Sequence, residues 1–170
     1  MLSKKISDAL NKQIAMEQFA SSYYLAAASW CAAKGFEGAS AFLFRHSDEE
    51  RGHMLKLVHY LNDHGGHAQS PSVGNVPSKF KALPEMFKEI LSHELEVSKA
   101  IHQLTDFCFK EKDFSTFNFL QWFIQEQREE ERLFNIVIEK FDLAGTEGQG
   151  LFLVDQYLKN LTSSLPAESA

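Results

Sequence analysis

The stretch FEGASAFLFRHSDEERGHM, residues 36–54, decides the fold because its residues alternate with the spacing of a helix packed inside a bundle. Core-type positions recur in steps of three and four, which is the seam pattern of left-handed helix packing. Extended to the end of this helix, the seam consists of Leu43, His46, Glu50, His53, Leu57 and Tyr60. The pattern predicts a long helix that presents charged residues on its apolar face.

Glycine and proline divide the rest of the chain into similar segments, because they are concentrated at residues 34–38, 64–84 and 145–150. The intervening segments predict four long helices, and Asp113 is a suitable N-cap for the last of them. These helices are expected at about 3–33, 37–63, 83–110 and 113–143. A shorter fifth helix is expected at about 148–161, with an apolar face made of Leu151, Val154, Leu158 and Leu161.

The predicted fold is therefore all-α, an antiparallel four-helix bundle with a short fifth C-terminal helix. Residues 1–170 form a single domain in this interpretation, with the bundle at about 3–143, the fifth helix at about 148–161 and a frayed tail at 162–170. The link at residues 64–82 could span ~60 Å at ~3 Å per residue, whereas a helix of about 27 residues is ~40 Å long. A long crossover between the second and third helices is expected, which lets them lie parallel.

Composition excludes several classes of partner and location. The net charge is −6 and no cluster of Lys and Arg is present, so neither nucleic acid nor an anionic membrane is an expected partner. The N-terminus has no apolar signal region and no stretch approaches ~18 apolar residues, so a cytoplasmic protein is expected. Cys31 and Cys108 are the only cysteines, and we interpret both as buried thiols rather than parts of a disulfide framework or a zinc site.

Turn geometry places the acidic residues of each helix pair at one height. Glu17 lies as far before the first turn as His53 lies after it, so antiparallel helices bring the two to the same height. In the same way, Glu94 lies as far before the turn at residues 112–113 as a position within one helical turn of Glu130 lies after it. Burial of an unpaired ionised carboxylate costs several kcal/mol, and bound cations remove that cost. The alternative is a set of protonated or hydrogen-bonded core carboxylates.

Glu50 and His53 form a Glu-x-x-His pair on one helical face, as in the di-metal sites of other bundle cores. Glu17 adjoins this pair, while Glu94 and Glu130 face it, and Glu50 is central enough to bridge two metals. Oxygen-rich ligation with an imidazole favours Fe(II) or Mn(II) over structural zinc.

Several neighbouring residues have two possible roles. The acidic side chains Glu49, Glu126 and Glu129 could hold a third iron or form a solvated acidic face. Gln127 could orient a ligand or bind oxygen-derived species. Tyr24 could hydrogen-bond a ligand carboxylate or donate an electron, or could serve only in packing. We interpret His46 as a core histidine satisfied by hydrogen bonding rather than as a ligand.

These motifs resemble those of a bacterial non-haem ferritin over almost the full chain. The resemblance is carried by Glu17 with Tyr24, by residues 36–54, by Glu94, and by TFNFLQWFIQEQREEERLF followed by LAGTEGQGLF. It implies one ferroxidase iron site of Glu17, Glu50 and His53, another of Glu50, Glu94 and Glu130, and a third of Glu49, Glu126, Glu129 and Glu130.

The resemblance further implies iron storage and detoxification. Two Fe(II) ions would be oxidised by O2 or H2O2, and ferric oxyhydroxide would be deposited inside a hollow shell of twenty-four subunits, with the short fifth helices around channels. The haem-binding branch of the family carries a second Glu-x-x-His pair and a Met. Gln127, Glu130 and Arg51 stand at those positions here, so no haem is expected.

Two other functions remain open at the level of the sequence. A di-iron oxygenase or peroxidase would need a substrate cavity beside the metals, where Trp122, Phe123 and Phe134 crowd the seam. A non-catalytic helical scaffold would be unaffected by Fe(II).

Overall fold

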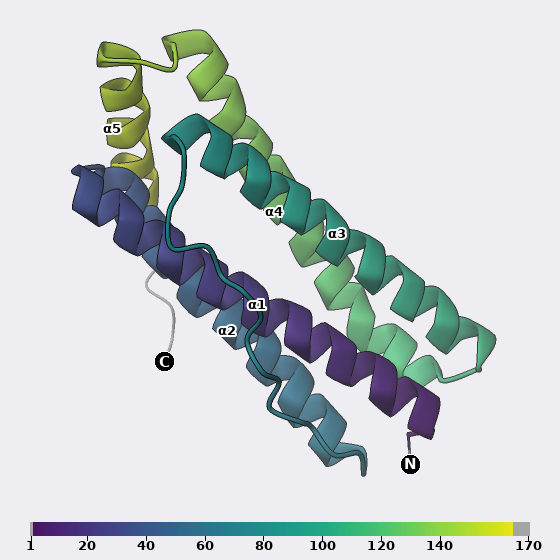
Figure 1. Cartoon of the computed structure of the whole chain (residues 1–170). Coiled ribbons are helices and arrows are strands. Elements are labelled where there is room, and N and C mark those ends of the chain that lie inside the picture. The colour runs from purple at the N-terminus through teal and green to yellow at the C-terminus, as the bar shows by residue number, and fades with distance from the viewer. Residues whose placement is uncertain (1, 165–170) are drawn as a thin grey trace.

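The computed structural model describes residues 2–164, and four long helices lie side by side in it (Figure 1). They are α1 (Lys4–Lys34), α2 (Glu37–Asp63), α3 (Leu83–Lys110) and α4 (Phe114–Ala144). A shorter helix, α5 (Gln149–Ser164), packs at the end of the bundle where α1 turns into α2 (Figure 1). The predicted all-α bundle with a fifth C-terminal helix is confirmed.

The link between α2 and α3 runs back along the whole bundle, so these two helices point the same way (Figure 1). It is anchored on α1, where the Asn11 amide donates to the His67 carbonyl at 3.0 Å and accepts from the Gln69 N–H at 2.8 Å. Nearer α3, Phe80 packs edge-on against Tyr23 and Trp30, with ring centroids 5.5 and 5.9 Å apart. The expected long crossover is therefore present.

Local signals explain where the hairpins turn. Gly35 ends α1 with a φ of 82°, a left-handed conformation that glycine adopts without steric penalty. Asp113 caps α4 as expected, because its carboxylate accepts the Thr116 N–H at 3.0 Å. These short turns make α1 antiparallel to α2 and α3 antiparallel to α4.

The N-terminus of α2 is capped from α5 rather than by its own flanking residue. The buried Asp155 carboxylate accepts the N–H groups of Gly38 at 3.1 Å and Ala39 at 2.8 Å, whereas Phe36 at the N-cap position has no side-chain acceptor. A Cβ at Gly38 would lie 1.9 Å from the Asp155 carbonyl oxygen, so only glycine permits this approach. This contact fixes α5 against the bundle.

The fifth helix is longer than expected. It continues to Ser164, and residues 165–170 of the expected tail lie outside the described residues. The hydroxyls of Thr162 and Ser163 donate to the carbonyls of Leu158 and Lys159 at 2.9 and 3.0 Å, which satisfies backbone acceptors in the last turn. The expectation of a tail frayed from residue 162 was wrong for residues 162–164.

The buried apolar residues form two clusters on either side of a polar layer. One cluster contains Phe42, Phe87, Phe134 and Phe141, and the other contains Ile14, Leu57, Ile101 and Leu120. All the expected seam positions of α2 are buried except Tyr60, which is half-buried and whose hydroxyl pairs with Thr116 at 3.0 Å. The clusters enclose the polar layer at mid-helix.

Replacing Asp155 with alanine should destabilise the protein by about 1 to 2 kcal/mol, because α2 loses the acceptor for its first N–H groups. Guanidinium denaturation followed by circular dichroism measures the change. Asn160→Ala, an exposed substitution on the same helix, is the control and should be nearly neutral. Equal stability of the two variants would contradict the capping role.

Candidate metal centre

Each long helix places one carboxylate in the polar layer. Glu17 comes from α1, Glu50 from α2, Glu94 from α3 and Glu130 from α4, and they are between 1% and 4% exposed. Because α2 also contributes His46 and His53, this layer joins acidic and imidazole side chains within an otherwise apolar core. The seam spacing and turn geometry thus correctly placed all four carboxylates inside the bundle.

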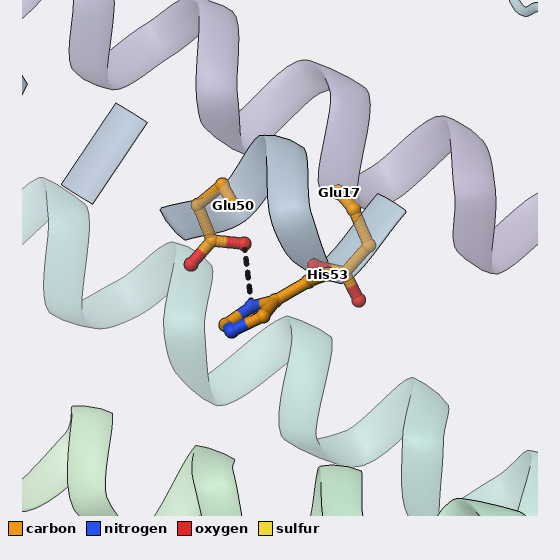
Figure 2. A group of neighbouring side chains, drawn as sticks. All are labelled: Glu17, Glu50 and His53. Carbon is orange, nitrogen blue, oxygen red and sulfur yellow. Dashed lines mark ion pairs between the residues drawn. The ribbon is translucent and has the colours of Figure 1, made fainter. Parts of the chain in front are cut away.

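Glu17, Glu50 and His53 form a candidate metal group in which all three residues are buried. One ligand atom from each lies within 4.8 Å of the others, and Figure 2 shows the three side chains turned toward one another. The Glu50 Oε2 and His53 Nδ1 atoms are 3.3 Å apart. The second oxygens, Glu17 Oε2 and Glu50 Oε1, are buried without a hydrogen-bond partner in the described structure. A cation would satisfy these acceptors, so the residues fit a metal ion.

Burial raises the pKa of every carboxyl group in the layer. For Glu17 the loss of hydration dominates, and the negative charge of Glu50 adds to it. For Glu130 the same loss is followed by the charges of Glu50 and Glu94. The layer therefore disfavours ionised carboxylates in the absence of a cation, and a divalent cation would compete with protons for them.

Glu94 is held by two donors. The Tyr24 hydroxyl donates to its Oε1 through a short hydrogen bond, and the Gln127 amide donates to its Oε2 at 2.9 Å. Burial and the neighbouring Glu94 charge raise the pKa of the Tyr24 phenol, which keeps its proton on the donor side. Tyr24 and Gln127 thus both hydrogen-bond the candidate ligand Glu94, which is one of the roles expected for each from the sequence.

The expected second trio is less compact than the first. Among the described residues, Glu50, Glu94 and Glu130 do not bring ligand atoms within 4.8 Å of one another. Both Glu94 oxygens are already hydrogen-bonded, which draws this carboxylate toward α4 and Tyr24. The charge of Glu94 nevertheless acts on Glu50, whose pKa is raised first by burial and then by Glu94.

The four carboxylates expected at a third site do not form one group in the structure. Glu49 lies within 4.8 Å of Glu126 and His53 in one group, and of Glu130 and His46 in another. Glu129 has an exposed side chain and belongs to neither group in the described part of the chain. The acidic cluster is thus partly turned to the core and partly to the surface.

Sequence reasoning missed Gln13, which is buried in α1 and donates its amide to Glu17 Oε1 at 2.7 Å. This hydrogen bond occupies one oxygen and leaves the unpartnered Oε2 for a cation. An amide one helical turn before a core glutamate was the available signal. Ser98 was also missed; it accepts from Gln127 at 3.4 Å and donates to Glu131.

Four-helix bundles that bring carboxylates and imidazole together in the core from facing helices form the class of carboxylate-rich metal-binding bundles. This chain has that architecture and that set of side chains. The chain belongs to the ferritin family, because the family model of the ferritin-like domain matches residues 7–144 of its sequence. The family resemblance read from the sequence is confirmed.

Known relatives span nearly the full chain. A bacterial non-heme ferritin of Campylobacter jejuni is 43% identical over 164 residues, covering 96% of this chain and 98% of its own. One from Escherichia coli O157:H7 is 39% identical over 161 residues, covering 95% and 98%. Among solved structures, an open-pore ferritin from Archaeoglobus fulgidus matches with a TM-score of 0.90 and 34% identity over 94% of this chain and 98% of its own. Within the described residues, none of the helices has the length and apolar character needed to cross a membrane.

Replacing Gln13 with methionine should weaken Co(II) binding at the Glu17 group by about tenfold, because supporting hydrogen bonds orient metal ligands. Isothermal titration of the metal-free protein with Co(II) measures the affinity. The control is Gln18→Met on the same helix, whose amide contacts Ser22 instead. Unchanged Co(II) affinity in the Gln13 variant would remove the positioning role.

Replacing Glu17 with glutamine should stabilise the metal-free protein at neutral pH by about 1 kcal/mol or more. The folded pKa of Glu17 lies above its ordinary value of 4.5, so its contribution to stability is full below that pH and is lost as the pH rises toward the folded pKa. Thermal unfolding of both proteins from about pH 4.5 to about pH 8 should therefore show a gap that grows with pH.

The exposed variant Glu139→Gln is the control for that comparison and should show no such gap. Adding Co(II) should reverse the order, because metal binding stabilises the wild type more than the variant. A pH-independent difference would show that Glu17 is ionised in the metal-free fold.

Proposed function

We propose that this protein stores and detoxifies iron by oxidising Fe(II) at a paired metal centre in the middle of each bundle. The observation that carries the proposal is the buried group of Glu17, Glu50 and His53, with two carboxylate oxygens that have no partner in the described structure. Membership of the ferritin family and similarity to bacterial non-heme ferritins support it.

In this proposal each residue's position decides which of the two iron ions it binds. Glu17 and His53 hold one Fe(II), Glu94 and Glu130 hold the other, and Glu50 contacts both. Because the layer is acidic and poorly hydrated, it binds the higher charge of Fe(III) more strongly than Fe(II), which favours loss of an electron. Gln127 and Tyr24 orient Glu94 through the hydrogen bonds to its two oxygens.

The oxidant accepts the electrons that the two Fe(II) ions lose. Two Fe(II) ions lose one electron each, and one O2 accepts both electrons and two protons to become H2O2. If H2O2 is the oxidant, it accepts two electrons and two protons and becomes two water molecules. Hydrolysis of Fe(III) to oxyhydroxide then releases protons to water.

The proposal includes a cytoplasmic shell of twenty-four copies that encloses the ferric oxyhydroxide. Support for self-association comes from the end of the bundle near α5, where Leu143, Phe152 and Leu153 are 82%, 61% and 52% exposed. Large apolar side chains exposed together are typical of association surfaces. The alternative of an oxygenase gains no support, because Trp122 and Phe123 pack edge-on against His53 at 5.4 and 6.2 Å.

Replacing Glu50 with alanine should slow Fe(II) oxidation by at least about tenfold, because the residue contacts both ions and its carboxylate favours Fe(III). Protein loaded with Fe(II) without oxygen and then mixed rapidly with oxygenated buffer gives the rate from ferric absorbance. Glu94→Ala should slow it as well, and light scattering should show particles of wild-type size.

The exposed Glu96, two residues from Glu94, provides the matched control Glu96→Ala, which should oxidise Fe(II) at the wild-type rate. Equal rates in all four proteins would remove the assigned centre. Iron that precipitates outside a small particle would refute storage and favour a scaffold or an oxygenase.

A further inference from the structure

His46 presents one ring nitrogen to the polar layer. Its Nδ1 lies 2.9 Å from the Phe42 carbonyl oxygen, which can only accept, so Nδ1 carries the proton. With the proton on Nδ1, Nε2 is the ring nitrogen whose lone pair can bind a cation. The imidazole is thus an acceptor at its inner edge.

Aromatic side chains hold this ring in place. The Phe42 ring lies 4.1 Å from the imidazole between centroids, and Phe134 packs edge-on against it at 5.4 Å. A backbone hydrogen bond on one nitrogen together with a fixed ring plane is the usual arrangement of a metal-binding histidine.

Nε2 faces another acceptor. It lies 3.7 Å from Glu130 Oε2, a buried oxygen with no hydrogen-bond partner in the described structure. Two ligands at about 2.1 Å from a common metal are typically separated by about 3 to 4 Å, which matches this spacing. Glu49 places a third ligand atom within 4.8 Å of both. Three side chains from α2 and α4 therefore place ligand atoms around one position.

We propose that His46, Glu49 and Glu130 form a third divalent-metal site with an imidazole nitrogen as ligand. The identification of its ion as Fe(II) rests on the proposed function; the site itself rests on the geometry. It differs from the all-carboxylate third site implied by the family resemblance, because His46 enters and neither Glu126 nor the exposed Glu129 takes part. A nitrogen ligand favours Fe(II), Co(II) and Zn(II) over Mg(II) and Ca(II).

The test uses His46→Asn, whose amide can still donate to the Phe42 carbonyl while Nε2 is lost. Metal-free protein is titrated with Co(II), and binding of a third equivalent per chain should weaken by at least about tenfold. His64→Asn is the matched control, because His64 Nδ1 makes the same bond to the Tyr60 carbonyl at 2.8 Å but is exposed at the far end of α2.

Nitrogen ligation is tested separately by pulsed EPR of bound vanadyl ion in a His53→Ala background. A nitrogen coupling that persists there and disappears in the His46→Asn, His53→Ala double variant is the expected result. A coupling unchanged by the second substitution, or three Co(II) equivalents bound with wild-type affinity in His46→Asn, would overturn the inference.

These readouts do not depend on iron oxidation. If His46→Asn leaves Co(II) binding unchanged while Glu50→Ala still slows oxidation, this inference fails and the proposed function stands. If nitrogen ligation is lost as expected but Glu50→Ala oxidises Fe(II) normally, the site stands and the proposed function fails.

Discussion

Burial of four carboxyl groups in one layer of an apolar bundle is the constraint on which the rest of this structure depends. Each group has lost most of its hydration, and the charges of Glu50 and Glu94 further raise the pKa of neighbouring carboxyl groups. The two apolar clusters above and below prevent the layer from opening to water. Burial and mutual repulsion disfavour the ionised carboxylates, so the electrostatics of the layer favour a bound cation.

The hydrogen bonds within the layer are distributed unevenly, and they indicate which carboxylate oxygens are held by donors and which are left to bind a cation. Glu94 has donors on both oxygens, and Glu17 has a donor on one. Glu50 and Glu130 each keep one buried oxygen without a partner in the described structure. Amide and phenol donors thus orient Glu17 and Glu94, and Glu17 keeps a second oxygen that, like those of Glu50 and Glu130, is left for a cation.

Much of this arrangement could be predicted because the relevant signals are local. The bounds of α2 and α3 were predicted to the residue, since glycine, proline and the seam spacing define them. Pairing of Gln13 with Glu17 could not be predicted, because an amide one turn away has several rotamers and only the packed core selects one. The same holds for Asp155, whose partners lie 116 and 117 residues away in the chain, and for Glu129, which adjoins Glu130 but faces solvent.

The cap from α5 links the end of the bundle to its centre. α2 carries His46, Glu49, Glu50 and His53, and its first N–H groups are held by Asp155. From Gly38 to Glu50 the helix rises by about 18 Å at about 1.5 Å per residue. Because glycine at position 38 permits the close approach of Asp155, the contact that holds α5 also fixes the end of the helix that carries these polar residues.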